Sequence, residues 1–183
     1  MTLRSTLLPP TLLSLSLLFT ACGPGGALGG GEGGFAAPEV VLTISTSGSG
    51  TPDPNNVYEV AVTNLDGSGF RQLTSDGKQK FLPHFSPDGS KLVYTKYTVG
   101  GYGGPNSKTV FAVYDLATGK ESVIADGGTA AIAQTSWSPD GKRIATIELG
   151  VPHSANQPPG SPLTIMNADG SNPVTVGGPS GAS

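Results

Sequence analysis

The sequence predicts an all-β chain, a partial β-propeller of about three four-stranded antiparallel blades in which the first blade is incomplete. A hairpin sequence at 85–95 contains Ser-Pro-Asp-Gly and returns at 137–147, 52 residues later. A second turn recurs with nearly the same spacing at 65–68, 117–120 and 168–171. A period near 50 residues with four short strands per unit is typical of propellers, because each small sheet needs stacked neighbours to cover its faces.

The composition agrees with a loop-rich β protein. The 183 residues include 28 Gly and 16 Pro, and 13% of them are charged, whereas typical domains have about 25% charged residues. The net charge is −3, and the ten Lys and Arg residues stand singly or in pairs. Because a basic cluster is missing from the sequence, we do not expect a nucleic acid partner.

The repeated turns use residues with defined backbone roles. Pro presets φ at the first central position, Asp accepts hydrogen bonds from nearby backbone N–H groups, and Gly adopts positive φ. The structural turn positions are Pro87, Asp88, Gly89, Pro139, Asp140 and Gly141 in the hairpins, and Asp66, Gly67, Asp169 and Gly170 in the second turn. We interpret these Asp residues as backbone caps, because calcium ligation needs several converging oxygens.

The strands are predicted unit by unit. The first unit is expected to have strands at 39–45, 57–63 and 70–74, without a clear inner strand. The second unit is expected to have strands at 82–85, 91–97, 109–114 and 121–125. The third unit is expected to have strands at 135–137, 143–149, 163–167 and 173–176. No helix is predicted.

Two features predict how the sheets pack. The strand at 109–114 has apolar residues on both parities, which favours a sheet covered on both faces. Phe85 and Trp137 occupy equivalent positions before the two hairpin turns. We expect both aromatic side chains to lie in the core between blades.

The repeats also resemble those of a known family. The Ser-Pro-Asp-Gly hairpins, together with Asn-Leu-Asp-Gly-Ser at 64–68 and Asn-Ala-Asp-Gly-Ser at 167–171, resemble the WD-like β-propeller repeats of TolB-type periplasmic proteins. The resemblance covers 39–177 and implies the propeller fold. It does not imply one function, because the repeat family spans binding proteins and the propeller domains of some peptidases.

The first 37 residues predict export and membrane anchoring. Residues 1–21 are interpreted as a signal peptide, with Arg4 ahead of an apolar run. The sequence Leu-Phe-Thr-Ala-Cys at 18–22 resembles a bacterial lipobox, which implies that Cys22, the single cysteine, carries the lipid. This resemblance favours the periplasmic face of the outer membrane.

The domain organisation follows from these features. After the signal peptide, 22–37 is expected to be the lipidated Cys with a Gly-rich tether. The propeller repeats fill 38–177, and 178–183 is expected to be a flexible tail. With one cysteine in the sequence, no disulfide within the chain is expected.

The sequence lacks a recognisable catalytic constellation. Its two histidines, His84 and His153, cannot form a multi-His metal cluster, and neither has a readable Ser and Asp partner. The motifs of a nucleophile elbow and of a phosphate-binding loop are also missing from the sequence. We therefore expect no enzyme activity, no metal and no cofactor.

A binding face is the expected functional feature. The long connections at 46–56, 98–108 and 150–162 would emerge on one face of a propeller, and function usually lies on such loops. The candidate binding residues there are Asn55, Asn56, Tyr102, Asn106, His153 and Asn156. The alternative is that these connections are tolerated surface insertions.

The sequence thus predicts a non-enzymatic cell-envelope lipoprotein whose repeats bind an envelope protein or glycan. The alternative is a propeller fragment of a prolyl-oligopeptidase-like serine peptidase that lacks its hydrolase domain. Propellers close with about 4 to 8 blades, so three blades leave the ring incomplete. We favour truncation of a longer propeller, with closure through self-association second and an open stack third.

Overall fold

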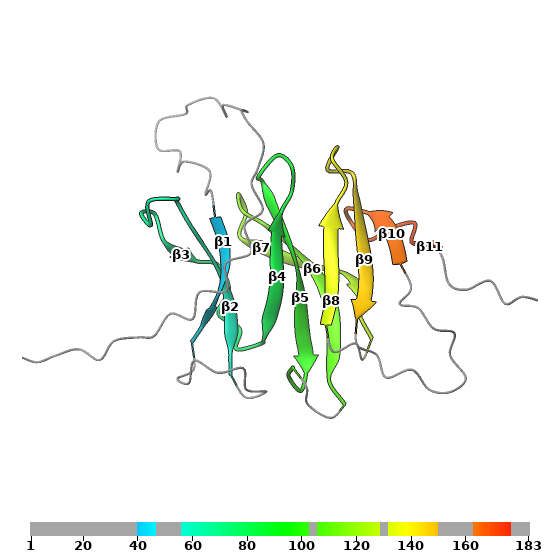
Figure 1. The fold of residues 1–183 in the computed structure, drawn as a ribbon, viewed down its shortest axis with the longest axis horizontal. Coiled ribbons are helices and arrows are strands. Elements are labelled where there is room, and N and C mark those ends of the chain that lie inside the picture. The colour runs from blue at the N-terminus through cyan, green and yellow to red at the C-terminus, as the bar shows by residue number, and fades with distance from the viewer. Residues whose placement is uncertain (1–39, 47–55, 103–105, 129–131, 150–162, 177–183) are drawn as a thin grey trace, which may run out of the picture.

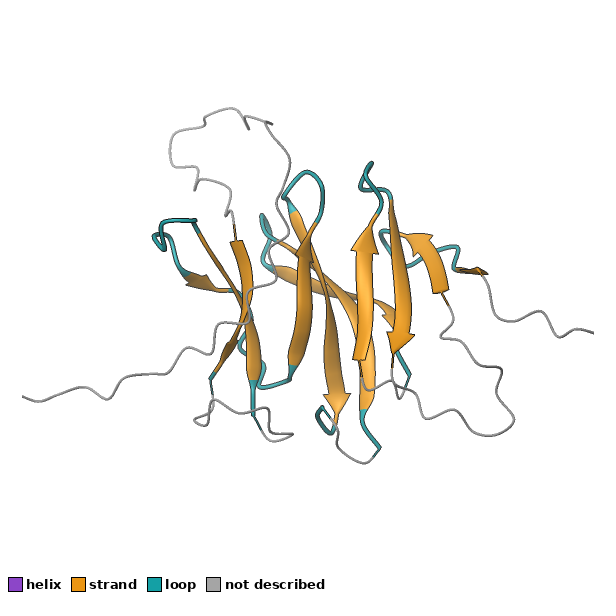
Figure 2. Ribbon diagram, in the orientation of Figure 1, coloured by secondary structure: helices purple, strands orange, loops and turns teal. Residues whose placement is uncertain are grey.

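A computed structural model describes residues 40–46, 56–102, 106–128, 132–149 and 163–176, and these residues form three small antiparallel sheets (Figures 1 and 2). The first sheet holds β1 (Val40–Ser45), β2 (Tyr58–Thr63) and β3 (Arg71–Gln72). The second holds β4 (Lys80–Phe85), β5 (Lys91–Val99), β6 (Lys108–Asp115) and β7 (Lys120–Asp126). The third holds β8 (Ile132–Trp137), β9 (Arg143–Leu149), β10 (Leu163–Asn167) and β11 (Val174–Val176).

The observed strands confirm an all-β partial propeller with an incomplete first blade. The second and third sheets have the orders β4-β5-β6-β7 and β8-β9-β10-β11, while the first has the order β1-β2-β3. The equivalent pairs Val40↔Thr63, Leu92↔Tyr114 and Ile144↔Met166 show that β1 corresponds to β5 and β9. The first sheet therefore lacks the inner strand among the described residues. Within these residues the structure contains no helix, and so none that could span a membrane.

The largest differences from the predicted strand bounds lie at β3, β4 and β8. The strand expected at 135–137 begins earlier, at Ile132, because Ile132, Ala133 and Gln134 pair with β9. The strand expected at 70–74 is paired only at Arg71–Gln72, because Leu73 and Thr74 both turn their N–H groups toward the Val60 carbonyl. The strand expected at 82–85 begins earlier, at Lys80, because Lys80 and Phe81 pair with β5 before an irregularity interrupts the ladder.

The second sheet is buried on both faces, as its apolar pattern predicts. Toward the first sheet it presents Leu92, Tyr94 and Ala112, which pack with Val60 and Val62. Toward the third sheet it presents a different set, Val93, Phe111, Val113 and Ile124, which pack with Ile144 and Met166. Side chains of β5 and β6 thus alternate between two cores.

The two hairpins have the same surroundings. Phe85 packs against the core between the first and second sheets, and Trp137 packs against the core between the second and third. The strand contacts repeat as well, since β1 packs against β4 and β5 packs against β8. The repeat seen in the sequence is therefore a repeat in space.

The turns have the predicted backbone geometry. Gly89 and Gly141 have φ values of 70° and 68°, and Gly67 and Gly170 have values of 80° and 85°. Each of the four turn Asp residues accepts a hydrogen bond at Oδ1 from the backbone N–H two residues later, at 2.9 to 3.1 Å. These bonds stabilise the turns locally.

Hydrogen bonds within the turns also lower the pKa values of the turn carboxyl groups. The main cause is a serine hydroxyl beside each carboxylate: Ser86 for Asp88 and Ser138 for Asp140, each at 2.6 Å. For Asp66 and Asp169 the serines are Ser68 and Ser171. A donor beside a carboxylate favours its charged form.

Candidate functional site

An aromatic cluster occupies the end of the sheets at which β2 begins and β5 ends, the lower end in Figure 1. Phe81 of β4 lies at its centre. The ring centroid of Phe81 is 5.2 Å from that of Tyr58, 5.7 Å from that of Tyr97 and 5.9 Å from that of Tyr102. These separations are in the range in which aromatic pairs attract one another. We call these four residues the aromatic cluster.

The aromatic cluster has one exposed tyrosine, which lies above less exposed aromatic rings. Tyr97 is 1% exposed, Tyr58 and Phe81 are half-buried, and Tyr102 is 38% exposed. Burial, with a smaller contribution from Tyr102, raises the pKa of Tyr97 to about 12. The Tyr97 hydroxyl therefore stays protonated at neutral pH. The Tyr97 side chain forms part of the buried floor of the aromatic cluster.

Buried polar residues fix the aromatic cluster to the neighbouring strands. Gln79, 4% exposed, accepts a hydrogen bond at Oε1 from the backbone N–H of Tyr102 at 2.6 Å. The Gln79 side-chain amide donates to the Asn56 backbone carbonyl at 2.6 Å. The backbone carbonyl of Gln79 accepts from the Tyr97 N–H at 2.9 Å. One glutamine thus ties together the connections before β2 and after β5.

The backbone of β4 is irregular beside the aromatic cluster. Leu82 has φ of 53°, and the pairing of β4 with β5 shifts between Phe81 and His84. A left-handed backbone is unfavourable for a bulky side chain by about 1–2 kcal/mol. Such strained positions persist only when the surroundings over-determine them, and here Phe81 is anchored on one side of Leu82 and Phe85 on the other.

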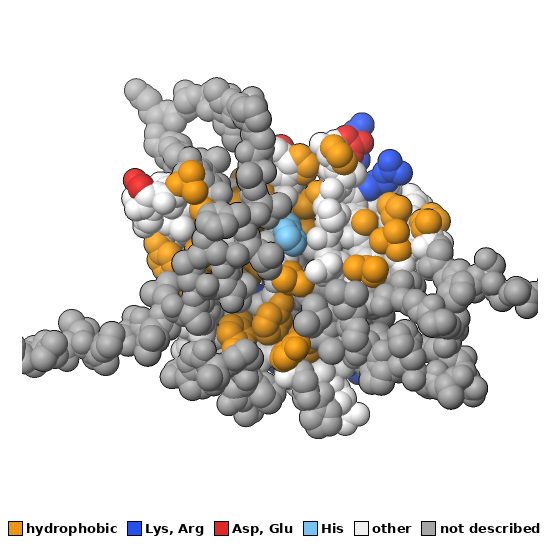
Figure 3. Space-filling model, in the orientation of Figure 1, with side chains coloured by type: hydrophobic (Ala, Val, Ile, Leu, Met, Phe, Trp, Pro, Cys, Tyr) orange, Lys and Arg blue, Asp and Glu red, His pale blue; other side chains and the backbone are white. Residues whose placement is uncertain are grey.

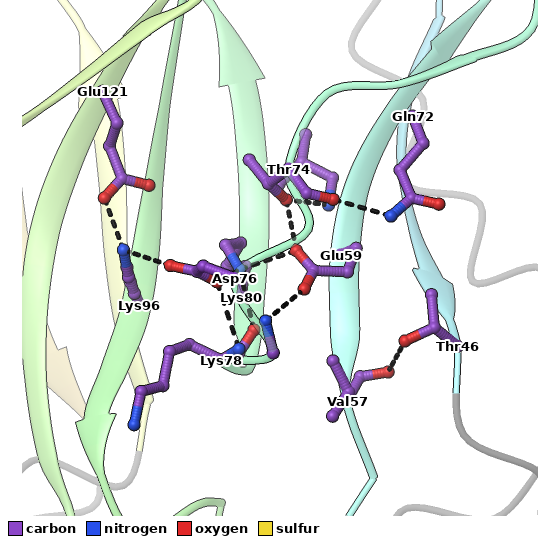
Figure 4. A network of polar contacts seen from close by, with 12 residues as sticks. Thr46, Val57, Glu59, Gln72, Thr74, Asp76, Lys78, Lys80, Lys96 and Glu121 are labelled. Atoms are coloured by element: carbon purple, nitrogen blue, oxygen red, sulfur yellow. Dashed lines mark hydrogen bonds and ion pairs between the residues drawn. The ribbon is translucent and has the colours of Figure 1, made fainter.

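A buried ionic network surrounds Lys80, which precedes Phe81 in β4 (Figure 4). Lys80, fully buried, donates to Glu59 Oε2 at 2.7 Å and to the Lys78 carbonyl at 2.9 Å, and it also pairs with Asp76. Glu59 also accepts hydrogen bonds from the Thr74 hydroxyl and from the Gly77 N–H at 2.9 Å. The network joins β2 of the first sheet to β4 of the second.

The ionic network continues across the second sheet. Asp76 pairs with Lys96 as well as with Lys80, and Lys96 also pairs with Glu121 of β7, which accepts a hydrogen bond from the Tyr94 hydroxyl. Burial raises the pKa of Asp76, but hydrogen bonds with Lys80 and Lys96 lower it by more, and the pKa falls to about 2. Asp76 therefore stays charged throughout the neutral range.

The predicted binding residues differ in exposure and in their neighbours. It brings Asn56 and Tyr102 together through Gln79, but Asn56 is 6% exposed and belongs to the base of the site. Asn106 is exposed in the same connection as Tyr102, with φ of 59°. Asn55, His153 and Asn156 lie outside the described residues, as does Cys22.

Sequence reasoning missed Tyr58, Phe81, Tyr97 and Gln79. Each lies at the start of a strand, near the end of a strand or in a connection. The sequence signal that could have found the three aromatic residues was their position beside long loops. His84 lies in β4 and is half-buried. Figure 3 shows a histidine side chain, in pale blue, at the surface beside hydrophobic side chains. Burial lowers the pKa of His84.

A hollow lies at the opposite end of the sheets, between the two hairpin turns. It has a volume of about 370 Å³ and is lined by Trp137 and Ala168 together with residues of both turns, among them Pro87, Asp88 and Pro139. The buried Trp137 Nε1 has no hydrogen-bond partner among the described residues. Among all the residues that the structure describes, no group of three or more His, Cys, Asp or Glu side chains could hold a metal.

Comparisons with known proteins agree with this geometry. The Tol-Pal system protein TolB of Rickettsia bellii is 31% identical over 114 residues, which are 62% of this chain and 23% of that protein. The crystal structure of TolB from Acinetobacter baumannii matches 69% of this chain and 28% of its own, with a TM-score of 0.50 and 21% identity. An acylaminoacyl peptidase matches 74% of this chain and 23% of its own, with a TM-score of 0.50 and 12% identity.

These likenesses show the fold: the chain carries β-propeller repeats that are similar to those of TolB. No protein-family model matches it. The chain spans about a quarter of the length of the TolB relative from Rickettsia bellii. The peptidase likeness shows the fold alone, so the fold is shared by proteins with different activities.

Proposed function

We propose that the chain is a non-enzymatic binding module of the cell envelope, and that it contacts a protein partner through the aromatic cluster. The observation that carries the proposal is an exposed tyrosine that is supported by buried side chains. Tyr102 is 38% exposed, its ring is tilted against that of Phe81, and its backbone N–H donates to the buried Gln79. A tyrosine fixed in this way loses little conformational entropy when it binds.

Two further observations support a protein as the partner. Tyrosine is among the residues enriched at the centres of protein interfaces, and Tyr102 stands beside further aromatic rings. The relative from Rickettsia bellii is named as a component of the Tol-Pal system. Phe81 connects Tyr102 with Tyr58 and Tyr97, so the site combines residues from both sides of the first inter-sheet contact.

The proposed location of the module rests on its first residues. We propose that 1–21 direct export, that a lipid on Cys22 and the tether 22–37 hold the repeats at the membrane, and that 178–183 form a tail. The periplasmic face of an outer membrane is the proposed location. The lipobox-like sequence before Cys22 and the Gly-rich composition after it support this assignment.

Photocrosslinking in cells tests the proposed protein contact. A benzoylphenylalanine in place of Tyr102 should give a discrete protein adduct, identified by mass spectrometry. The matched control is the same substitution at Phe70, which is 54% exposed and precedes β3 outside the aromatic cluster. Adduct from position 102 and not from position 70 is expected. Equal adducts from both positions, or none from position 102, would contradict a protein partner at this site.

A further inference from the structure

The connection at 75–79 joins the ionic network to the aromatic cluster. It leads from the first sheet into β4, and Gln79 is its last residue. The Gln79 side chain uses both ends of its amide: Oε1 accepts from the Tyr102 N–H and the nitrogen donates to the Asn56 carbonyl, each at 2.6 Å. The position of this connection therefore determines where the backbone of Tyr102 is held.

The buried pair of Glu59 and Lys80 holds this connection at two consecutive residues. Glu59 Oε1 accepts from the Gly77 N–H at 2.9 Å, and Lys80 Nζ donates to the Lys78 carbonyl at 2.9 Å. The two side chains also bind each other, Nζ to Oε2, at 2.7 Å (Figure 4). These three bonds fix the two residues that directly precede Gln79.

The two sequence neighbours of Lys80 hold Tyr102. Gln79, on one side, binds the backbone N–H of Tyr102, and Phe81, on the other side, lies against its ring with the centroids 5.9 Å apart. Lys80 itself is 0% exposed, and its side chain is bound by Glu59 from the first sheet. A shift of Lys80 would therefore move both supports of Tyr102 together.

Glu59 and Lys80 are too deeply buried to touch a partner. Glu59 is 1% exposed, whereas Tyr102 is 38% exposed. Hydrogen bonds with charged members are about twice as strong as neutral ones, and a buried polar network whose members are bonded is rigid. The pair can therefore act on a partner only through the position that it gives to Tyr102.

We propose that Glu59 and Lys80 are positioning residues for the contact at Tyr102. The inference rests on the proposed function of the aromatic cluster and adds that the contact depends on a buried ion pair between two sheets. A binding group works only when a supporting set of side chains holds it in place, and here that support reaches Tyr102 from the first sheet through Lys80 and Gln79. The position of Tyr102 can be measured without a partner, so the two proposals can fail separately.

Hydrogen–deuterium exchange of the full chain tests the positioning. The substitution is Glu59→Gln, which places an NH2 group where one carboxylate oxygen accepts, so either the bond from the Gly77 N–H or the bond from Lys80 is lost. Exchange of the Tyr102 amide, followed by NMR, should become about tenfold faster, as expected for the loss of one hydrogen bond.

Two controls separate positioning from a general loss of stability. The first is the Gly128 amide, whose N–H also donates to a side-chain oxygen, Asp126 Oδ1, at 2.8 Å. Its exchange should not change in Glu59→Gln. The second is Gly89→Ala, which strains a left-handed turn outside the ionic network. This variant should leave the exchange at Tyr102 as it is in the parent chain.

A double variant keeps the test decisive where Glu59→Gln leaves the Lys80 charge stranded and the chain does not fold. Glu59→Gln combined with Lys80→Met removes both charges of the pair. It also removes the bond to the Lys78 carbonyl, so the Tyr102 amide should again exchange faster than in the parent chain.

Photocrosslinking connects the position with the contact. A benzoylphenylalanine at position 102 should give less adduct in Glu59→Gln than in the parent chain, and as much in Gly89→Ala as in the parent. Unchanged exchange at Tyr102 in both network variants, equal acceleration at the control amide or in Gly89→Ala, or full adduct from Glu59→Gln would overturn the positioning. A parent chain without adduct would contradict the proposed function alone, since the exchange test needs no partner.

Discussion

Gly170 and Gly89 have similar left-handed backbones and different surroundings. Their φ values are 85° and 70°. A Cβ on Gly170 would meet the Ile124 carbonyl oxygen at 2.1 Å, whereas Gly89 has nothing within 4 Å. Gly89→Ala should therefore cost about 1 kcal/mol, the backbone contribution alone.

Gly170→Ala should cost clearly more, because backbone atoms of β7 must also move. Urea unfolding of the two variants beside the parent chain measures both costs. Equal losses would show that the turn at 168–170 does not press on β7. A neutral Gly89→Ala would contradict the assignment of the Ser-Pro-Asp-Gly turn.

Asp76 makes stability depend on pH in the acid range. Its pKa is about 2 in the folded chain, against an ordinary value of 3.8 for an Asp side chain. Because the folded value is the lower one, Asp76 contributes stability above about pH 4, and this contribution is lost as pH falls toward 2. Asp76→Asn should reduce the free energy of unfolding at pH 7 and flatten its decline between pH 4 and 2.

The measurement for Asp76 is the difference between variant and parent, since other turn carboxyl groups titrate in the same range. Unfolding by denaturant at several pH values gives this difference. The Asp76 side chain is 41% exposed, so the effect should be modest. A difference that does not change between pH 5 and 2 would show that Asp76 has an ordinary pKa.

At the scale of elements, β2 and β4 are joined by the buried pair of Glu59 and Lys80. Lys80 is 0% and Glu59 is 1% exposed. Removing one member of a buried pair leaves an uncompensated charge, which costs about 3–5 kcal/mol. Lys80→Met should therefore destabilise the chain by about 3 kcal/mol or more.

A second substitution separates the charge effect from lost packing. Glu59→Gln added to Lys80→Met removes the stranded charge and keeps an acceptor for the Gly77 N–H, which Glu59 Oε1 binds at 2.9 Å. The double variant should be more stable than Lys80→Met alone in thermal unfolding. A double variant that is less stable than Lys80→Met would show that the uncompensated charge is not the main cost.

The described ion pairs that cross between sheets all involve the first and second sheets. Lys80 joins them through Glu59, whereas Lys91 and Asp115 pair within the second sheet. The contact between the second and third sheets is apolar where it is described, around Phe111, Ile144 and Met166. Buried charges add geometric specificity at a cost in desolvation. The ionic network therefore links the incomplete first sheet to the second.

At the scale of the whole molecule, the proposed membrane attachment depends on Cys22. Replacing Cys22 with Ser should abolish incorporation of labelled fatty acid and release the chain from the membrane fraction, because no other thiol is present in the sequence. Ser5→Ala, ahead of the apolar run, serves as the control and should keep the label. Continued labelling of the Cys22→Ser chain would contradict lipidation at this site.

Much of the fold could be predicted from the sequence, because the turns carry local chemistry. Pro87, Asp88 and Gly89 specify a hairpin without help from distant residues. The candidate site could be predicted only in part. Tyr102 and Asn56 were expected on one face, but the part of Gln79 in joining them was not, because it depends on residues 23 positions apart.

The sequence by itself determined the repeat, the strand positions and the turn geometry, because these depend on neighbouring residues and on a period that returns every 52 positions. Only the tertiary structure decided which charges are buried together and which aromatic rings meet. Lys80 gives no sequence signal of burial, and its charge is tolerated because Glu59, from another sheet, lies 2.7 Å away. Contacts of this kind depend on how sheets stack, and stacking brings together residues that local patterns treat separately.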